Sequence, residues 1–385
     1  MNAAPRQLGD ETSPEDLAEA RAELRAIARG LLGKTRVPAA PGWGLMASSG
    51  WLGLEVPPAL DGAGATFAEV AVIAEELGRA VARGPYLGSA VLGVGTLREL
   101  ARHPATDDLL RRTAAGDAVP AAVLVPGGSA GGRHGGGVPF WLARTADGLR
   151  LNGQAVFVPD AAEATTLLVL ARAVDDGAPV IVELDPQAAG IVIEPQPVLD
   201  ETRRLAMVRA EGAEIATESV RRFAGDPRAT VRRLLDRAAV AVACDSLGLS
   251  EAMLDATVGY ARVREQFGRP VGSFQAVKHA CADMLIRVRV ARELVAAAVT
   301  ALAGDPAGIG TVDLSPADVS TAASMAKAYA CEAAVEVAGK AMQLHGGIGY
   351  TWESGIHLYL KRAALNRSLF GAPAAHRRRL AERYK

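Results

Sequence analysis

Two segments in the C-terminal third of the chain combine residue types that can bind a dinucleotide. The first, residues 264–271 (REQFGRPV), presents the guanidinium of Arg264, the amide of Gln266 and the ring of Phe267 beside a Gly/Pro turn, and Gln275 follows at the start of the next expected helix. A fixed cation with amide donors suits a pyrophosphate, and an aromatic ring suits a heteroaromatic face. A plain inter-helix loop with a solvated arginine explains the same residues and stays open.

The second segment, residues 343–351 (QLHGGIGYT), places Gly346 and Gly347 directly after a long alanine-rich stretch. Paired glycines are a good helix C-terminus and also let a ligand approach the backbone closely. A simple helix stop accounts for the glycines, but it leaves the polar Gln343 unexplained.

Other motifs are weaker. Residues 127–131 match G-x-S-x-G, but the glycine-rich continuation is a poor start for the helix that a nucleophile elbow requires, so a flexible surface loop is favoured. The chain contains neither a P-loop nor a Rossmann glycine motif between strand and helix. The six histidines do not fall at metal-ligand spacing, so no metal site is expected.

Three regions of different periodicity must position these segments. Helical patterns dominate residues 13–116, including an amphipathic helix over 67–81. Residues 118–225 shift toward period two, with seven short runs separated by Gly, Asp, Asn and Pro. These runs span residues 121–125, 141–144, 149–151, 156–158, 166–170, 180–184 and 191–195.

From Asp226, which can cap a helix starting at Pro227, long helices continue to about residue 367. The pattern predicts an α+β protein with an N-terminal helical domain (1–117), a middle antiparallel β-sandwich or barrel domain (118–225), and a C-terminal four-helix bundle (226–385). The bundle is expected to carry the cofactor and oligomer contacts.

Composition narrows the class of protein. The 385 residues are 50% apolar and 22% charged, with 42 Lys+Arg against 43 Asp+Glu. A net charge of −1 gives no case for binding nucleic acid or an anionic membrane. Three separated cysteines fit buried free thiols in a reducing compartment, and no apolar run is long enough for a membrane span, so a cytoplasmic protein is expected.

Together, residues 264–270 with Gln275 and residues 343–351 resemble the two signatures of the acyl-CoA dehydrogenase family, and weaker similarity runs through most of the chain. The resemblance implies a flavoenzyme that holds FAD at a subunit boundary of a dimer or tetramer. Arg264, Gln266 and Phe267 would contact the FAD of a neighbouring subunit. Gln343, Gly346 and Gly347 would approach its pyrophosphate and adenosine portions.

The reaction implied is α,β-dehydrogenation of an acyl-CoA thioester to the trans-2-enoyl-CoA, within lipid metabolism. A carboxylate base takes the α-proton, a hydride passes to the flavin, and an electron-transfer acceptor reoxidises it.

The chain departs from the family pattern at the reacting centre. Phe370 stands where the usual Glu precedes a glycine, residues 125–129 lack the acid of the substrate-side loop, and Pro159 replaces a hydroxyl residue that normally faces the flavin. Residues 351–353 and 357–362 are similar to bacterial members that work as heteromers.

Asp245 is the substitute base that the sequence suggests. It lies on the apolar face of a helix with Val242 and Leu249, where lost hydration would raise its pKa. A buried acid satisfied by hydrogen bonds explains it equally well.

Two further interpretations remain. The chain could be a companion subunit of a heteromeric dehydrogenase, which helps form the flavin site without supplying the base. A flavin-dependent oxidase or monooxygenase on the same fold is the weaker alternative.

Overall fold

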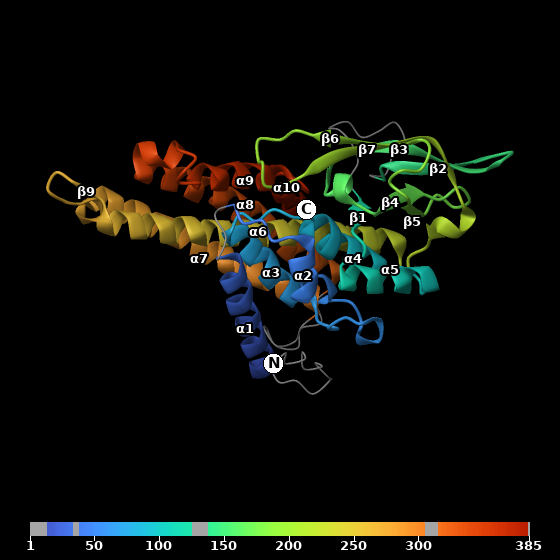
Figure 1. Ribbon diagram of the computed structural model, residues 1–385, viewed down its shortest axis with the longest axis horizontal. Coiled ribbons are helices and arrows are strands. Elements are labelled where there is room, and N and C mark those ends of the chain that lie inside the picture. The colour runs from blue at the N-terminus through green and yellow to red at the C-terminus, as the bar shows by residue number, and fades with distance from the viewer. Residues whose placement is uncertain (1–13, 34–37, 125–137, 305–314, 384–385) are drawn as a thin grey trace.

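The chain folds into a helical body with a β sheet at one end (Figure 1). A computed structural model describes residues 14–33, 38–124, 138–304 and 315–383. Figure 1 shows the sheet above helices α4 and α5, while the longest helices run away from it to the hairpin that contains β9. This is the mixed α+β architecture that the sequence predicts.

The N-terminal helices are joined by ion pairs as well as by apolar packing. They are α1 (Pro14–Leu32), α2 (Trp43–Ser48), α3 (Phe67–Arg79), the π-helical segment η3 (Tyr86–Gly93), α4 (Val94–Arg98) and α5 (Pro104–Ala115). Three arginines of α1, four residues apart and therefore on one face, pair with buried glutamates of α3. The pairs are Arg21–Glu69 at 2.7 Å, Arg25–Glu75 at 3.2 Å and Arg29–Glu76 at 2.6 Å.

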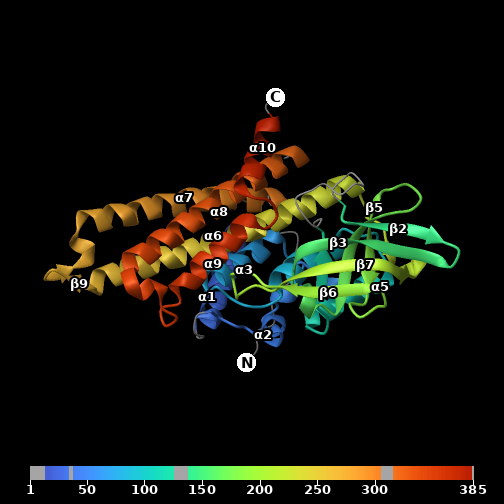
Figure 2. The same ribbon diagram turned by 90° about the horizontal axis from the view of Figure 1, so that it is seen from above.

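The middle region is one eight-stranded sheet, in which the strands follow the order β6-β7-β3-β2-β4-β5-β8 and β1 pairs with β4. Figure 2 shows β6, β7, β3 and β2 side by side in this order. The strands are β1 (Pro120–Val123), β2 (Phe140–Thr145), β3 (Gly148–Pro159), β4 (Thr166–Arg172), β5 (Pro179–Leu184), β6 (Ile191–Gln196), β7 (Leu205–Ile215) and β8 (Val220–Arg221). The predicted strand positions are confirmed, with two of the predicted runs forming the single strand β3. The expectation of a purely antiparallel domain is wrong, because β1 and β2 both run parallel to β4.

Strand β7 was missed by the sequence pattern. Its side chains include the charged Arg209, Glu211 and Glu214, and Gly212 interrupts the run. Its pairing with β3 and β6 is what makes it a strand, since long-range pairing overrides a weak local preference.

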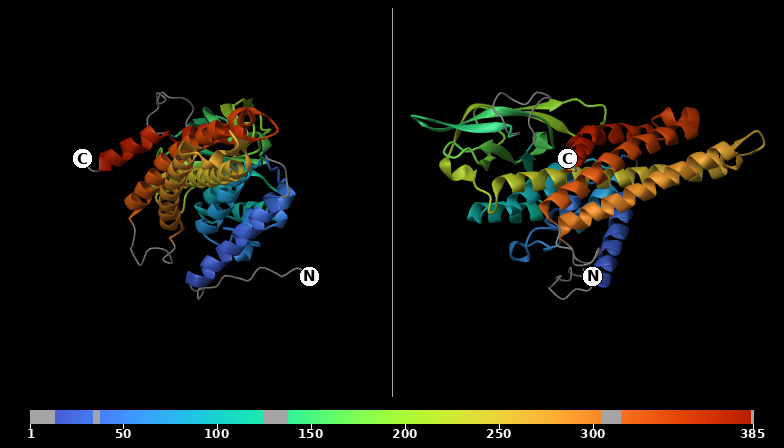
Figure 3. Two further views of the ribbon diagram at one scale, coloured as in Figure 1. Left: turned by 90° about the vertical axis from the view of Figure 1, so that its left-hand side faces the viewer. Right: turned by 180° about the vertical axis from the view of Figure 1, so that it is seen from behind.

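The C-terminal region contains three long helices, α6 (Pro227–Val263), α7 (Gln275–Ala303) and α8 (Pro316–His345), with α9 (Ile356–Ser368) and α10 (Pro373–Arg383) beside them. Asp226 caps α6 as predicted, since its Oδ1 accepts from the Ala229 N–H at 2.6 Å. Figure 3 shows the long helices side by side. Fully buried alanines of α8, among them Ala326, Ala330 and Ala334, allow this close approach.

Cys244 and Cys331 are buried free thiols, as expected, whereas Cys281 is half-buried. Within the described ranges, no helix is both long and apolar enough to cross a membrane.

Helices α3 and α6 cross at two glycines. A Cβ on Gly248 would lie 1.9 Å from the carbonyl oxygen of Glu75, and one on Gly78 would lie 2.0 Å from that of Asp245. Backbone therefore meets backbone at this crossing, which joins the N-terminal helices to the C-terminal bundle in one core.

We expect Gly248→Ala to lower the free energy of unfolding by about 1–3 kcal/mol or more, because the added methyl group forces α3 and α6 apart. The matched control is Gly259→Ala in the same helix, where a Cβ meets no described atom within 4 Å. That control should be neutral or raise stability by up to about 1 kcal/mol. Urea denaturation of the full chain measures both, and equal stabilities would contradict the close crossing.

Candidate functional site

The first segment predicted to bind a dinucleotide forms a hairpin at the end of α6. Strand β9 (Glu265–Gln266) pairs with β10 (Arg269–Pro270), and the turn between them uses left-handed backbone at Phe267 (φ 53°) and Gly268 (φ 74°). Arg264 closes α6, and its carbonyl accepts from the Val271 N–H at 2.7 Å. The ring of Phe267 is 91% exposed.

The second segment ends α8 at the same end of the bundle. The Tyr260 ring of α6 stacks on His345 with centroids 4.5 Å apart, and His345 Nδ1 donates to the Ala341 carbonyl at 2.8 Å. This stack brings the C-termini of α6 and α8 together. Gly346 adopts φ 63°, and a Cβ on Gly346 or Gly347 would meet no described atom within 4 Å.

All seven residues predicted to contact the cofactor are exposed. They lie near the C-terminal ends of α6 and α8, at the end of the bundle away from the sheet (Figure 1). They are Arg264, Gln266, Phe267, Gln275, Gln343, Gly346 and Gly347. The donor set fits a dinucleotide, since it combines a free guanidinium, carboxamides, an aromatic face and an open glycine backbone. The surface is open, so a cofactor held here needs a second wall from another chain.

Asp245, the predicted base, lies elsewhere in the molecule. Its carboxylate receives the Arg362 guanidinium through Nη2 at 2.6 Å and Nε at 3.1 Å, Arg203 Nη2 at 3.0 Å, and Asn366 Nδ2 at 2.6 Å. Burial alone would raise the pKa of Asp245, but the charges of Arg362 and Arg203 and these hydrogen bonds hold the pKa at about 2. The expected rise in pKa is therefore wrong, and the arrangement is that of a satisfied buried acid.

The surroundings of Asp245 are closely packed. A cavity of about 20 Å³ remains between Asp245, Arg203, Arg362 and the side chains of Leu77 and Tyr86. Because one water needs roughly 10–15 Å³, this cavity does not admit an acyl chain.

The end of β3, which the family resemblance places against the flavin, is covered by η3. The Gly88 N–H donates to Asp160 Oδ2 at 2.7 Å, and a Cβ on Gly88 would lie 2.5 Å from the Pro159 carbonyl. Burial raises the pKa of Asp160 to about 7. The helix backbone is thus seated directly on the strand end at this position.

Phe370 lies in a fixed turn between α9 and α10. Its φ is 53°, and its carbonyl accepts from His376 Nε2 at 3.0 Å. Burial lowers the pKa of His376 to about 4, so the imidazole is neutral near pH 7. The ammonium of Lys327, fully buried, donates to the carbonyls of Asn366 at 3.0 Å and Gly371 at 2.9 Å.

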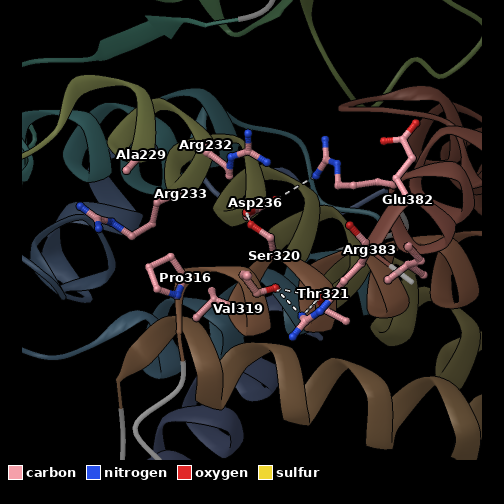
Figure 4. A pocket seen from close by; sticks show the side chains of 14 residues that line it. Ala229, Arg232, Arg233, Asp236, Pro316, Val319, Ser320, Thr321, Glu382 and Arg383 are labelled. Carbon is pink, nitrogen blue, oxygen red and sulfur yellow. Dashed lines mark hydrogen bonds and ion pairs between the residues drawn. The ribbon is translucent and has the colours of Figure 1, made fainter. Parts of the chain in front are cut away.

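A basic pocket of about 610 Å³ opens between α6, α8 and α10 (Figure 4). Four guanidiniums line it, with Asp236 among them; they belong to Arg232, Arg233, Arg379 and Arg383. Arg379 pairs with Asp236 at 3.1 Å, Arg233 pairs with Glu99, Arg383 pairs with Asp318, and Glu382 also lines the pocket. The volume suits a nucleotide-bearing ligand, and among the described residues Arg232 is the lining arginine without an ion pair, so its guanidinium is the one available to a phosphate.

The sequence did not reveal the partners that lower the pKa of Asp245. Arg362 and Arg203 are 117 and 42 residues away from it, and the basic pocket draws on three separate helices. The helical spacing of apolar residues before Arg362 is the signal that could have predicted an inward-facing side chain, because Leu358 and Tyr359, one turn earlier on α9, are buried too. The substrate-side loop (125–129) and the G-x-S-x-G segment (127–131) lie outside the described residues.

We expect Asp245→Asn to lower the free energy of unfolding by about 3–5 kcal/mol, because it leaves two buried guanidiniums without a counter-charge. Asp255→Asn, in the same helix, is the control. Its side chain is 65% exposed and pairs with Arg79, so its loss costs about 0–1 kcal/mol. Urea denaturation at pH 7 separates the two, and equal losses would contradict the structural role.

The pH dependence of the free energy of unfolding is an independent check on the low pKa of Asp245. A carboxyl whose pKa is lower in the folded state contributes stability above its unfolded pKa of about 3.9 and loses that contribution as pH falls toward 2. The wild-type chain should lose about 2 kcal/mol more than Asp245→Asn over this range.

Comparison with known proteins identifies the family to which both helical regions of the chain are similar. The profile of the acyl-CoA dehydrogenase C-terminal domain matches residues 228–385, and that of the N-terminal domain matches residues 17–117. The acyl-CoA dehydrogenase IpdE2 of Mycolicibacterium smegmatis is 31% identical over 339 residues, which cover 88% of this chain and 86% of that protein.

Solved structures share the whole architecture. A steroid acyl-CoA dehydrogenase, the Tcur3481-Tcur3483 G363A variant, superposes with a TM-score of 0.79 at 28% identity, covering 95% of this chain and 98% of that chain. The ChsE4-ChsE5 complex of Mycobacterium tuberculosis gives 0.80 at 24% identity, covering 95% and 97%, which shows a common fold. The family consists of flavoproteins that normally bind FAD. This chain therefore belongs to the acyl-CoA dehydrogenase family.

Proposed function

We propose that this chain is the cofactor-sharing companion subunit of a heteromeric acyl-CoA dehydrogenase. Its hairpin and glycine pair would form one wall of an FAD site whose other wall, with the catalytic carboxylate, belongs to a related subunit. The complex would convert an acyl-CoA to the trans-2-enoyl-CoA and pass electrons to an electron-transfer acceptor. Bound FAD would supply the hydride acceptor.

The observation that carries the proposal is the contrast between the surface predicted to contact the cofactor and the surroundings of the predicted base. At the end of the bundle, Arg264 and Gln343 are exposed, although Gln343 Oε1 accepts from Lys340 Nζ at 3.1 Å, and a Cβ on Gly346 or Gly347 would meet no described atom within 4 Å. Beside Asp245, a buried ion cluster leaves about 20 Å³. The chain can thus offer groups to a neighbour's cofactor more readily than it can hold an acyl group of its own.

The chemistry of the second place supports the same role. A carboxylate with a pKa of about 2 is a poor base near pH 7, because proton transfer to it is uphill by about 7 kcal/mol relative to a group with a pKa near 7. Phe370 offers no proton acceptor. The ChsE4-ChsE5 structure is a complex of two different chains, which is the kind of assembly proposed here.

The basic pocket favours a second candidate, in which this chain itself binds and dehydrogenates the acyl-CoA. Arg232 is exposed in a pocket large enough for a nucleotide. The phosphates of coenzyme A would be recognised there by charge.

The companion role predicts that the chain purified alone carries less than about a tenth of an FAD per protomer, and that co-expression with a related subunit gives a complex with bound FAD. In that complex, Arg264→Ala should lower FAD affinity by about 10-fold or more, because a charge-assisted contact is worth about 1.5–3 kcal/mol. Arg111→Ala, at an exposed arginine of α5 outside the donor set, is the control. Full FAD content and turnover by the isolated chain would contradict the proposal.

The second candidate is tested by titrating the full chain with coenzyme A in a calorimeter. If this chain binds the substrate, Arg232→Ala should weaken binding by about 10-fold. Arg228→Ala, exposed on the same helix but outside the pocket, should leave binding unchanged. Absence of wild-type binding would remove this candidate and leave the companion role standing.

A further inference from the structure

Two aromatic rings and one guanidinium meet at the tip of the hairpin formed by β9 and β10. Figure 1 shows this hairpin projecting from the end of the bundle. The guanidinium carbon of Arg269 lies 4.1 Å from the centroid of the Phe274 ring, over the face of that ring. The Phe267 ring makes a T-shaped contact with the same ring, with centroids 6.2 Å apart and planes at 83°. Phe274 therefore contacts the residues on both sides of Gly268 in the turn.

The base of the hairpin is fixed by backbone contacts, and its tip is not. At the base, the Arg264 carbonyl accepts from the Val271 N–H at 2.7 Å, and a Cβ on Gly272 would lie 2.8 Å from the carbonyl oxygen of Ala261 in α6. Beyond this base, each strand contributes only two residues, and so short a two-stranded ribbon is marginal in water. The turn also holds Phe267 at φ 53°, which a residue other than glycine rarely adopts. The ring contacts are what keep the tip in this conformation.

Phe274 is itself fixed at the start of α7. Its N–H donates to the Val271 carbonyl at 3.2 Å, and its carbonyl accepts from the N–H groups of Val277 and Lys278, both at 3.1 Å. Its side chain is half-buried. The hairpin tip is thus attached to α7 through Phe274, while the hairpin base is attached to α6, and both helices determine where the tip lies.

The ring contact gives the two arginines of the hairpin different roles. Arg264 and Arg269 are both exposed, and neither forms an ion pair with a side chain that the structure describes. The Arg269 guanidinium is held on the Phe274 ring, and a stacked guanidinium is less free to turn toward a phosphate. Arg264 has no such contact and stays available to a ligand.

We propose that Arg269 and Phe274 are positioning residues for the dinucleotide cofactor: they hold the hairpin tip in its bound conformation before the cofactor arrives. A loop that is already ordered loses less conformational entropy on binding, so the affinity contributed by Arg264 and Phe267 is greater. The inference deepens the proposed companion role and rests on it for the identity of the ligand. The contact itself is a property of this chain alone and can be measured without a cofactor.

Hydrogen exchange of the isolated full chain, followed by mass spectrometry over residues 266–271, tests the contact. Arg269→Gln should speed exchange there by about 2- to 5-fold, the factor that an exposed cation–π contact is worth. Phe274→Leu should speed it by about 2- to 10-fold, because the contact with Phe267 is lost as well. Phe274→Tyr keeps the ring and should restore the wild-type rate, and the double variant should exchange no faster than Phe274→Leu. Arg378→Gln, the same charge change at an exposed residue of α10, is the control and should leave the rate unchanged.

The same variants test the consequence for binding in the complex co-expressed with a related subunit. Arg269→Gln and Phe274→Leu should raise the dissociation constant of FAD by the same factors as they raise exchange, and Phe274→Tyr should restore the affinity. Flavin fluorescence on dilution of the complex measures this constant. Arg269→Gln changes an exposed side chain, so it keeps the test valid even if Phe274→Leu lowers the melting temperature.

The outcomes separate this inference from the companion role. Exchange that is unchanged in both Arg269→Gln and Phe274→Leu would overturn the positioning role. Faster exchange with unchanged FAD affinity would overturn it too, in a complex whose affinity falls on Arg264→Ala. If Arg264→Ala itself leaves FAD affinity unchanged, the companion role is wrong, and the exchange rates still show whether Arg269 and Phe274 hold the tip.

Discussion

The ion cluster around Asp245 connects parts of the chain that are far apart in sequence. Asp245 belongs to α6, Arg362 and Asn366 to α9, and Arg203 to the loop before β7. Arg362 also donates to the carbonyl of Ala82, after α3, at 3.0 Å. The carboxylate is therefore the point at which the N-terminal helices, the sheet and the C-terminal bundle are fixed together. Its desolvation is offset only because four donors reach it at once.

The ion cluster limits both the protonation of Asp245 and the space beside it. A carboxylate that holds three regions together cannot also change protonation freely, because each protonation would release two buried guanidiniums. The packing that satisfies the cluster also leaves room for little more than one water. The hairpin, the glycine pair and the arginine-lined pocket lie at the surface instead, where a ligand can reach them.

The sequence predicts features that depend on near neighbours. The cap at Asp226, the loop after Arg264 and a helix predicted over residues 67–81 all follow from local chemistry, and the structure has them, with that helix ending at Arg79. The helical face that buries Asp245 could also be predicted, because burial repeats along one helix. What that burial does to the pKa could not, since the sign is decided by Arg362 and Arg203, which sequence spacing does not bring near. The parallel pairing of β1 and β2 with β4 was out of reach for the same reason.

The exposed ring of Phe267 at the surface and the ion cluster around Asp245 in the interior both fit the proposed assembly with a second subunit. The phenyl ring of Phe267, which is 91% exposed, costs solvation free energy in a monomer, and the proposed neighbouring subunit would remove it from water. Association then contributes to stability by mass action. The interior cluster gives the helices the fixed geometry on which such interfaces depend, because α6 carries Asp245 in its middle and the hairpin at its end. A rigid cluster around Asp245 therefore fixes the position of the hairpin, and the proposed cofactor site between two chains would require that position to be the same in every copy.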